Sequence, residues 1–407
     1  MELLAPAGNL EKLKAAILYG ADAVYCGGGS FSLRAANTSF SLEDLAEGMA
    51  IAHHHQRRLY LALNIFPFDQ DLPAMKGYLK EAIDMGIDGV ILSDPGVLTM
   101  ARELDSKLKI HLSTQANITN SASVRFWREQ GVDRIVLARE LSLEQIKGIR
   151  EKVPEVELEV FAHGAMCVAF SGRCLLSQLL TDRSANRGQC SQPCRWEYEI
   201  REVGRDEWLG MEEDERGTYL LNSRDLCMIE HLPALAEAGV SSLKIEGRMK
   251  TAYYVAAVTR VYRAALDLLK REPLSFRVDP EWLKELEKVS HRPYTSGFYI
   301  PGNVESTEYP EDASYIRDYD FVGVVDNTDA GGGMLVVSAR NYFARGDQLE
   351  IIVPGYSTSM SFRVEKIINC LDEQELEAAH NSYQVKVLAE GNFPVTIREG
   401  SIIRRKI

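Results

Sequence analysis

The stretch YGADAVYCGG, residues 19–28, returns in altered form at three later places in the chain. The other copies are MGIDGVILSD (85–94), QGVDRIVLAR (130–139) and AGVSSLKIEG (238–247). In each copy a glycine is followed by a short polar segment and then by a run of leucine or β-branched residues. Polar or glycine residues end the copy. A glycine in this place is typical of the end of a helix, and the apolar run is typical of a buried parallel strand. The phrase therefore predicts repeated helix-to-strand units.

Eight apolar runs are candidate strands of one sheet. They are ELLAPA (2–7), AVYCG (23–27), RLYLALNIF (58–66), GVILSD (89–94), KIHLSTQA (109–116), RIVLARE (134–140), LEVFAHGA (158–165) and SLKIEG (242–247). Helical patterns lie between them, for example at 9–19, 41–55 and 142–153, and these begin with Asn or Ser caps. Eight such units predict a TIM-like (β/α)8 barrel over residues 1–275. A doubly wound open sheet is the alternative, which we disfavour because no GxGxxG follows the first strand.

The rest of the chain has a different pattern. Residues 276–315 read as a helix and a linker, and residues 316–407 contain short alternating runs that turn at Gly or Asn. This pattern predicts a small all-β C-terminal barrel.

Polar residues follow the predicted barrel strands, where enzymes with this fold carry their chemistry. We expect them to form a pocket for an anionic ligand. The catalytic candidates are Asn64, His163 and Glu246. The substrate-binding candidates are Gln115, Asn117, Arg139, Lys244 and Arg248, and Asp94 and Glu140 complete the expected rim.

Composition narrows the class of protein. No apolar run reaches the roughly 18 to 20 residues that a membrane helix needs, and the N-terminus lacks the order of a signal peptide. We therefore expect a cytoplasmic protein that does not span a membrane. The net charge of −13 does not indicate a nucleic-acid binder, but local basic stretches exist at 244–271 and at Arg173, Arg183, Arg187 and Arg195.

Four cysteines cluster in the segment that follows the seventh strand, roughly residues 164–222. HGAMCVAFSGRCLLS (163–177) contains Cys167 and Cys174, and CSQPC (190–194) contains Cys190 and Cys194. A reducing compartment disfavours disulfides, and a thiol nucleophile paired with His163 would not need four thiols. A metal site uses all four; the wide spacing C-x6-C-x15-C-x3-C modestly favours an iron–sulfur cluster over zinc. Cys26, Cys227 and Cys370 occur singly in apolar runs and are expected to be inert core thiols.

Several motifs resemble one known family. EVFAHGAMCVAFSGRCLLS (159–177) is similar to the signature of the collagenase-like peptidases of the U group, family thirty-two. The opening segment 2–28, STQAN (113–117), RGQCSQPCRWEYEI (187–200), LNSRDLC (221–227) and LKIEGRMK (243–250) resemble the same family. The resemblance extends over nearly the whole chain and is strongest to the members that hydroxylate bacterial tRNA.

The resemblance implies a specific function, which composition and motif spacing alone do not indicate. It implies a [4Fe–4S] cluster on Cys167, Cys174, Cys190 and Cys194, and a 5-hydroxylation of the wobble uridine in tRNA that depends on prephenate. The implied partners are the tRNA anticodon loop, prephenate and an electron-donor protein. Phe170, Trp196 and Tyr219 are candidates for stacking on the uridine.

Two other functions remain open at this point. One is a collagenase-like peptidase, although the chain contains neither HExxH nor GxSxG. The other is a non-catalytic iron–sulfur partner of a hydroxylase. Four cysteine ligands would leave no iron open to substrate, which favours an electron-transfer or structural role for the cluster.

Overall fold

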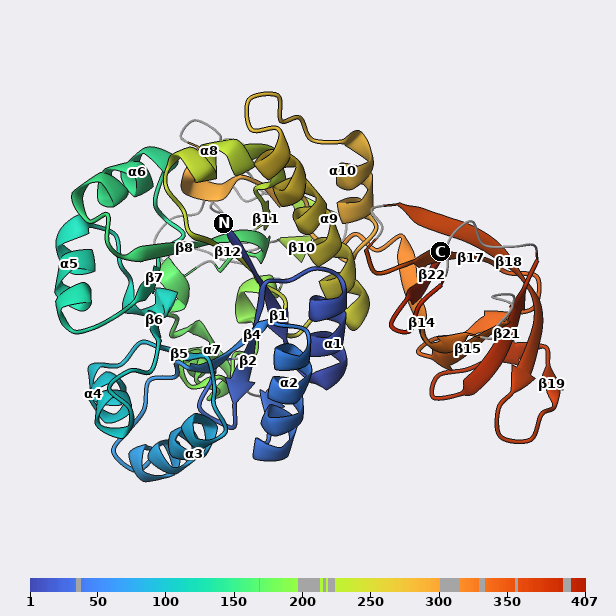
Figure 1. Ribbon diagram of the computed structural model, residues 1–407, viewed down its shortest axis with the longest axis horizontal. Helices are drawn as coiled ribbons and strands as arrows, with labels where there is room; N and C mark the ends of the chain where they lie inside the picture. The colour runs from blue at the N-terminus through green and yellow to red at the C-terminus, as the bar shows by residue number, and fades with distance from the viewer. Residues whose placement is uncertain are drawn as a thin grey trace, which may run out of the picture.

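The computed structural model describes most of the 407 residues. The described ranges are 1–33, 38–167, 169–196, 213–214, 217–218, 224–300, 315–328, 334–355, 358–390 and 397–407. Figure 1 shows two bodies, a large barrel wrapped by helices and a smaller all-β unit at its side. No helix in these ranges combines the length and apolar character that crossing a bilayer requires.

Eight parallel strands close the large barrel, as the repeated phrase predicts. In spatial order they are β1 (Glu2–Ala7), β2 (Ala23–Gly28), β4 (Arg58–Leu63), β5 (Gly89–Leu92), β6 (Ile110–Leu112), β7 (Arg134–Val136), β8 (Glu157–Ala165) and β12 (Ser242–Ile245). β12 pairs with both β8 and β1, so the sheet has no free edge among these eight strands. The open doubly wound alternative is therefore excluded.

Helices cover the outside of this barrel. They are α1 (Leu10–Leu18), α2 (Leu42–His54), α3 (Leu72–Asp84), α4 (Pro95–Leu104), α5 (Ser121–Glu129), α6 (Leu143–Lys152), α8 (Leu232–Glu237) and α9 (Ala252–Arg271). A further helix, α10 (Pro280–Glu287), packs against α9.

Local sequence signals explain where these helices begin and end. Asn9 accepts a hydrogen bond from the backbone amide of Lys12, while Ser41 and Ser142 form capping boxes. The four glycines of the repeated phrase, at positions 20, 86, 131 and 239, have φ values of 105°, 90°, 85° and 75°. That left-handed conformation ends a helix and is costly for any residue with a Cβ. The repeated glycine thus turns the chain from each helix into the next strand.

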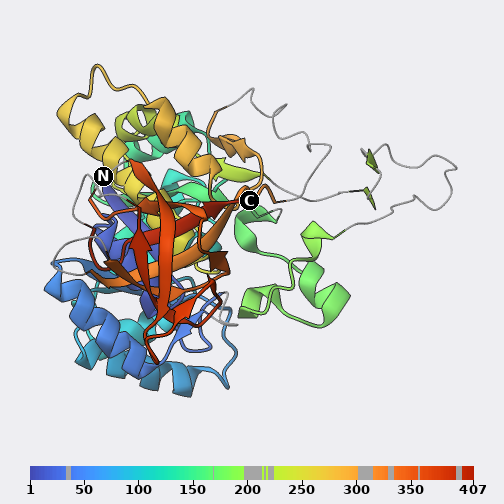
Figure 2. The ribbon, with the colours of Figure 1, turned by 90° about the vertical axis from the view of Figure 1, so that its right-hand side faces the viewer.

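The insert leaves the barrel after β8, the seventh strand of the wall, and contains α7 (Leu176–Thr181). In Figure 2 its described part, drawn in green at the right, projects from the barrel while the C-terminal domain faces the viewer. Two short strands, β9 (Glu213–Asp214) and β10 (Gly217–Thr218), form a separate antiparallel pair. The chain then returns through β11 (Asp225–Cys227), which pairs antiparallel with β8, a strand that the sequence patterns did not predict.

The segment 276–315 does more than link the two domains. It contains α10 and then β13 (Tyr294–Thr295), which pairs parallel with β11 and extends the large sheet. A further short strand, β3 (Ser39–Phe40), pairs parallel with β2.

The C-terminal domain is a six-stranded antiparallel barrel. Its strands are β14 (Tyr319–Thr328), β15 (Met334–Ala339), β17 (Gln348–Ile352), β18 (Ser359–Asn369), β21 (Gln384–Ala389) and β22 (Ile402–Lys406). The order β17-β22-β14-β15-β21-β18 closes because β17 also pairs with β18. Short strands β16 (Phe343–Ala344), β19 (Glu375–Leu376) and β20 (Ala378–Ala379) decorate it. The predicted all-β barrel is confirmed.

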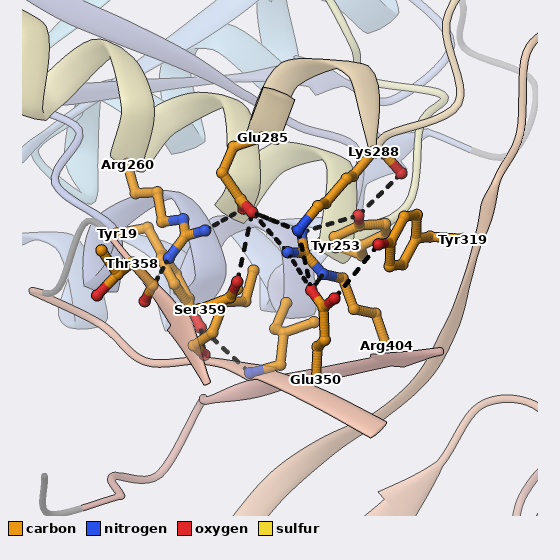
Figure 3. A network of polar contacts seen from close by, with 12 residues as sticks. Tyr19, Tyr253, Arg260, Glu285, Lys288, Tyr319, Glu350, Thr358, Ser359 and Arg404 are labelled. Carbon is orange, nitrogen blue, oxygen red and sulfur yellow. Dashed lines mark hydrogen bonds and ion pairs between the residues drawn. The ribbon is translucent and has the colours of Figure 1, made fainter. Parts of the chain in front are cut away.

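A buried ionic network joins the two domains (Figure 3). Arg404 of β22 is fully buried and contacts Glu285 of α10 at 2.7 Å and Glu350 of β17 at 2.6 Å. Burial would raise the pKa of Glu285, but hydrogen bonds from Arg404 and the nearby cations outweigh it and lower that pKa to about 2. Tyr19, the residue directly after α1, donates a 2.7 Å hydrogen bond to the carbonyl of Ile352. The two domains therefore share one packed interface.

This interface uses part of the basic stretch 244–271. Arg260 is 4% exposed and pairs with Glu285, while Arg263 pairs with Asp22 and with Asp267. Arg260 also donates to the carbonyl of Thr358 and so ties the barrel to the C-terminal domain, whereas both ion pairs of Arg263 lie within the barrel. These paired cations are therefore not free to bind RNA phosphates.

Candidate functional site

A cavity opens at the C-terminal ends of the barrel strands, beneath the insert. Its volume is about 110 Å³, which leaves room for a small ligand. Six of the eight candidate catalytic and substrate-binding residues line it together with all four clustered cysteines. These lining residues are Asn64, Gln115, Arg139, Lys244, Glu246, Arg248, Cys167, Cys174, Cys190 and Cys194.

Lys244 lies at the strand end of β12 and is 5% exposed. Its Nζ is 3.2 Å from Oε1 of the fully buried Glu159 and 4.3 Å from the centre of the Tyr25 ring. Burial lowers the pKa of Lys244, while the Glu159 carboxylate opposes that shift. Burial would raise the pKa of Glu159, but Lys244 and Arg134 outweigh it and hold that pKa below its ordinary value. A buried ion pair therefore fixes the position of the ammonium group of this cavity-lining residue.

Two arginines supply the remaining positive charge. Arg248 is 4% exposed; its guanidinium donates to the hydroxyl of Ser32 at 3.3 Å and to the carbonyl of Leu33. Arg139 donates one 3.3 Å hydrogen bond to the carbonyl of Ala165, and its guanidinium carbon lies 3.9 Å from the centre of the Phe161 ring. Both side chains are held by neutral partners, so their charges remain available to an anion.

Polar side chains between these cations organise the strand ends. Asn64 accepts from the backbone amide of Leu33 and donates to the hydroxyl of Ser113, both at 3.1 Å. Tyr25 donates at 3.4 Å to Oε2 of Glu246. Asn64 therefore positions neighbouring strands, whereas Glu246 places a carboxylate at the cavity wall.

The structure does not bring His163 to this cavity. The pairing register between β8 and β12 shifts after Lys244 and Phe161, so that His163 lies opposite Ile245. This bulge turns the His163 ring outward, where it is 1% exposed and contacts Tyr254, Tyr262 and Tyr294. Burial lowers the pKa of His163 to about 3, so the ring is neutral at physiological pH.

Three other predicted rim residues do not line the cavity. Asn117 takes a left-handed conformation at the end of a short 3-10 turn and does not line the cavity. Asp94 caps α4 by accepting from the amides of Gly96 and Val97. Glu140 accepts two hydrogen bonds from Ser171 in the insert, at 2.6 and 2.9 Å.

The Glu140–Ser171 contact is one of several that fix the insert over the barrel. Arg187 binds Asp71 through both guanidinium nitrogens, at 2.7 and 3.1 Å. The amide of Cys174 donates at 3.2 Å to Asn186, its neighbour within the insert. The cysteine-bearing backbone is therefore tied to the ends of at least two barrel strands.

The four clustered thiols differ in setting from the other three. All four line the cavity, whereas none of the other three does. Cys26 is completely buried, and burial raises its pKa to about 12. Burial likewise raises the pKa of Cys227 to about 11. Cys370 is only partly buried, so its expected place in a core is wrong.

The arrangement of these thiols bears on the kind of metal they suit. Among the residues that the structure describes, no three His, Cys, Asp or Glu side chains are grouped to hold one metal ion. Thiolates around one tetrahedral zinc lie about 4 Å apart, which disfavours a preformed zinc site. All four thiols nevertheless line one cavity, which a shared cluster would require of its ligands.

Two of the candidate stacking aromatics are described. Phe170 is 52% exposed and Trp196 is 43% exposed, and Tyr219 lies outside the described residues. Sequence reasoning missed Tyr25, Phe161 and Glu159, whose side chains surround Lys244. Alternation along the strands could have identified them, because residues two apart face the same side of a strand.

Comparison with known sequences identifies relatives over both domains. A profile described as Peptidase family U32 matches residues 8–308, and one described as Peptidase family U32 C-terminal domain matches residues 317–404. A Bacillus subtilis (strain 168) protein named tRNA hydroxylation protein P1 is 40% identical over 386 residues, covering 94% of this chain and 90% of that relative.

Two further relatives have different names. A 23S rRNA 5-hydroxycytidine synthase of Escherichia coli (strain K12) is 35% identical over 370 residues, covering 87% of this chain and 52% of the relative. A protein of Porphyromonas gingivalis (strain ATCC BAA-308 / W83) named Collagenase is 34% identical over 310 residues, covering 74% of this chain and 73% of the relative.

Proposed function

Because this chain belongs to peptidase family U32, and two of the relatives above are named for RNA hydroxylation, we propose that it is an RNA-hydroxylating enzyme. Its proposed target is C5 of the wobble uridine in tRNA, in a reaction that depends on prephenate. A tRNA substrate places this activity in the cytoplasm.

One observation carries the proposal: four thiols and three cations line a single cavity at the strand ends of the barrel. Cys167, Cys174, Cys190 and Cys194 are the proposed ligands of a [4Fe–4S] cluster. When bound, such a cluster supplies one-electron chemistry, which suits the poorly reactive C5 position of a pyrimidine. Four protein ligands leave no iron open, so we assign the cluster to electron transfer. Hydroxylation of C5 removes two electrons from the base, and we propose that the cluster passes these to a redox partner protein.

The cations give the cavity its proposed second ligand. Prephenate carries two carboxylates, and Arg139, Lys244 and Arg248 would bind them through charge-assisted hydrogen bonds. Glu246, the carboxylate on the cavity wall, is the candidate proton acceptor during the reaction. The anticodon loop would present the uridine unstacked, as enzymes that modify bases require.

A peptidase mechanism receives less support from the geometry. The name of the Porphyromonas gingivalis relative favours it, but a thiol nucleophile needs a nearby base. His163, the base closest in sequence to Cys167, is buried among three tyrosines on the outer face of the wall. A non-catalytic partner of a hydroxylase would use the same cysteines and must be separated by experiment.

The first experiment measures iron and acid-labile sulfide in protein purified without dioxygen. We expect about four of each per chain. Cys174→Ala should lose most of the iron, while the matched variant Cys370→Ala, altered in the C-terminal domain, should retain it. Zinc in place of iron, or iron that survives in Cys174→Ala, would contradict the assigned ligands.

The second experiment tests the reaction itself. The chain is produced in a bacterial strain whose tRNA lacks 5-hydroxyuridine, and wobble uridine is analysed by mass spectrometry. Wild-type protein should restore the modification, whereas Cys174→Ala should not. A strain unable to make prephenate should also lack the product. If iron is bound but the tRNA stays unmodified unless a second protein is supplied, the partner role replaces the enzymatic one.

A further inference from the structure

An exposed aromatic ring lies in the loop that follows β4. Phe68 is 60% exposed, and the guanidinium carbon of Arg187 lies 4.5 Å from the centre of its ring. The ring is therefore covered by a cation on one side yet largely open to solvent. Such a pair resembles the stacking arrangements by which proteins bind unpaired bases.

Hydrogen bonds hold this pair in place. Arg187 binds both carboxylate oxygens of Asp71 and also donates to the carbonyl of Phe66 at 3.3 Å. The backbone amide of Phe68 donates at 2.7 Å to the same Asp71 carboxylate. One carboxylate thus fixes both the guanidinium and the backbone that bears the ring. A ligand that stacks on Phe68 would meet a pre-organised surface and would lose little affinity to ordering it.

The pair lies next to the insert that carries the cysteines. The amide of Phe66 donates at 3.0 Å to the carbonyl of Asn186, and the Asn186 side chain accepts from the amide of Cys174. Ala185, which precedes Asn186, lines the cavity. The loop and the insert therefore meet at the edge of the cavity.

The charges around this edge suit a polyanion. Arg173 and Arg183 are exposed on the insert, and Arg173 also lies over the ring of Phe66 at 5.6 Å. Phosphates of a single strand can bind such cations while its bases stack on aromatic rings. An exposed phenylalanine beside several arginines suits the bases and phosphates of a single-stranded RNA.

We propose that Phe68, backed by Arg187, is a stacking platform for an unpaired base of the RNA substrate that lies next to the modified nucleotide. The proposal rests on the proposed RNA-hydroxylating function and names a binding surface for its substrate. None of the motifs in the sequence pointed to this residue.

Anisotropy of a fluorescently labelled anticodon stem–loop tests the platform with the full-length holoprotein. Phe68→Ala should raise the Kd by roughly 5- to 100-fold, the range expected for losing one base stack. Phe68→Tyr should bind within a few-fold of wild type, and Phe68→Leu should bind almost as weakly as Phe68→Ala. The matched control is Phe126→Ala on α5, a side chain that is 54% exposed and lies in none of these contacts.

The outcomes separate this proposal from the proposed function. If Phe68→Ala binds the stem–loop within twofold of wild type while wild type modifies tRNA, the platform is wrong and the function stands. If Phe68→Leu equals wild type, the contact is apolar and stacking is wrong. If Phe68→Ala loses product but keeps its RNA affinity, Phe68 contacts a protein partner and not RNA. If wild type neither binds nor modifies tRNA, both proposals fail.

Discussion

Phe161 and His163 are separated by one residue on β8, yet they face opposite sides of the barrel wall. Phe161 lies opposite Lys244 and lines the cavity, whereas His163 lies opposite Ile245 and contacts tyrosines outside. In a regular strand, residues two apart share a face. The bulge between them breaks this alternation and places His163 on the outer face of the wall, away from the cavity.

His163→Phe should therefore preserve RNA hydroxylation and reduce the sensitivity of folding to acid. The folded protein keeps His163 neutral with a pKa of about 3, while the unfolded chain takes up a proton near pH 6.5. Its contribution to stability is complete above pH 6.5 and falls by about 1.4 kcal/mol per pH unit as the pH drops toward 3. Urea unfolding between pH 7 and pH 5 should show a shallower decline in the variant.

The exposed His54 gives a matched control for that measurement. His54→Phe should leave both the acid sensitivity and the activity as they are in wild type. Loss of activity in a folded His163→Phe protein would show that His163 takes part in the reaction.

Arg139→Gln should weaken prephenate binding without unfolding the protein. Arg139 donates to the carbonyl of Ala165, lies over Phe161 and lines the cavity, so its guanidinium can contact a ligand there. Loss of a charge-assisted hydrogen bond corresponds to roughly 10- to 100-fold in Kd, which calorimetry on the holoprotein would measure. Arg125→Gln, an exposed change on α5, is the control. An unchanged Kd would show that Arg139 does not bind prephenate.

Glu140→Ala should loosen the insert. The Glu140 carboxylate accepts from both the amide and the hydroxyl of Ser171, and charged acceptors of this kind contribute about 2 kcal/mol each. We expect faster proteolysis within the insert and faster loss of iron to a chelator. Glu144→Ala, an exposed change nearby, should behave as wild type. Equal rates in both variants would show that other contacts hold the insert.

Arg404→Met should destabilise the whole chain by about 3–5 kcal/mol, because Glu285 and Glu350 would lose their shared buried cation. Guanidinium unfolding measures this loss, and Lys406→Met on the exposed end of the same strand is the control. An effect below about 1 kcal/mol would mean that water or Lys288 compensates for the missing charge.

The sequence predicted the barrel because its signals are local. Each glycine of the repeated phrase ends a helix in the conformation that glycine favours, and Ser41 and Ser142 cap helices as their spacing predicts. The cavity followed from the barrel, since residues at strand ends such as Asn64 and Arg139 necessarily meet at one rim.

Non-local features escaped prediction. The bulge at His163 depends on how β8 pairs with β12, about 80 residues away, and β11 exists only because β8 extends beyond the wall. The role of Arg404 depends on Glu285 in the other domain. Neighbouring residues in the sequence reveal neither partner, so periodicity alone could not have assigned these side chains.

Closure of the wall by β12 also sets an order of events during synthesis. β1 is made first, but it cannot complete the barrel wall until β12 has been made. Only then are the ammonium of Lys244 and the carboxylate of Glu246 present at the cavity. The cysteine segment leaves the ribosome before those groups exist. Whatever occupies the cavity is therefore enclosed only after translation has passed residue 248.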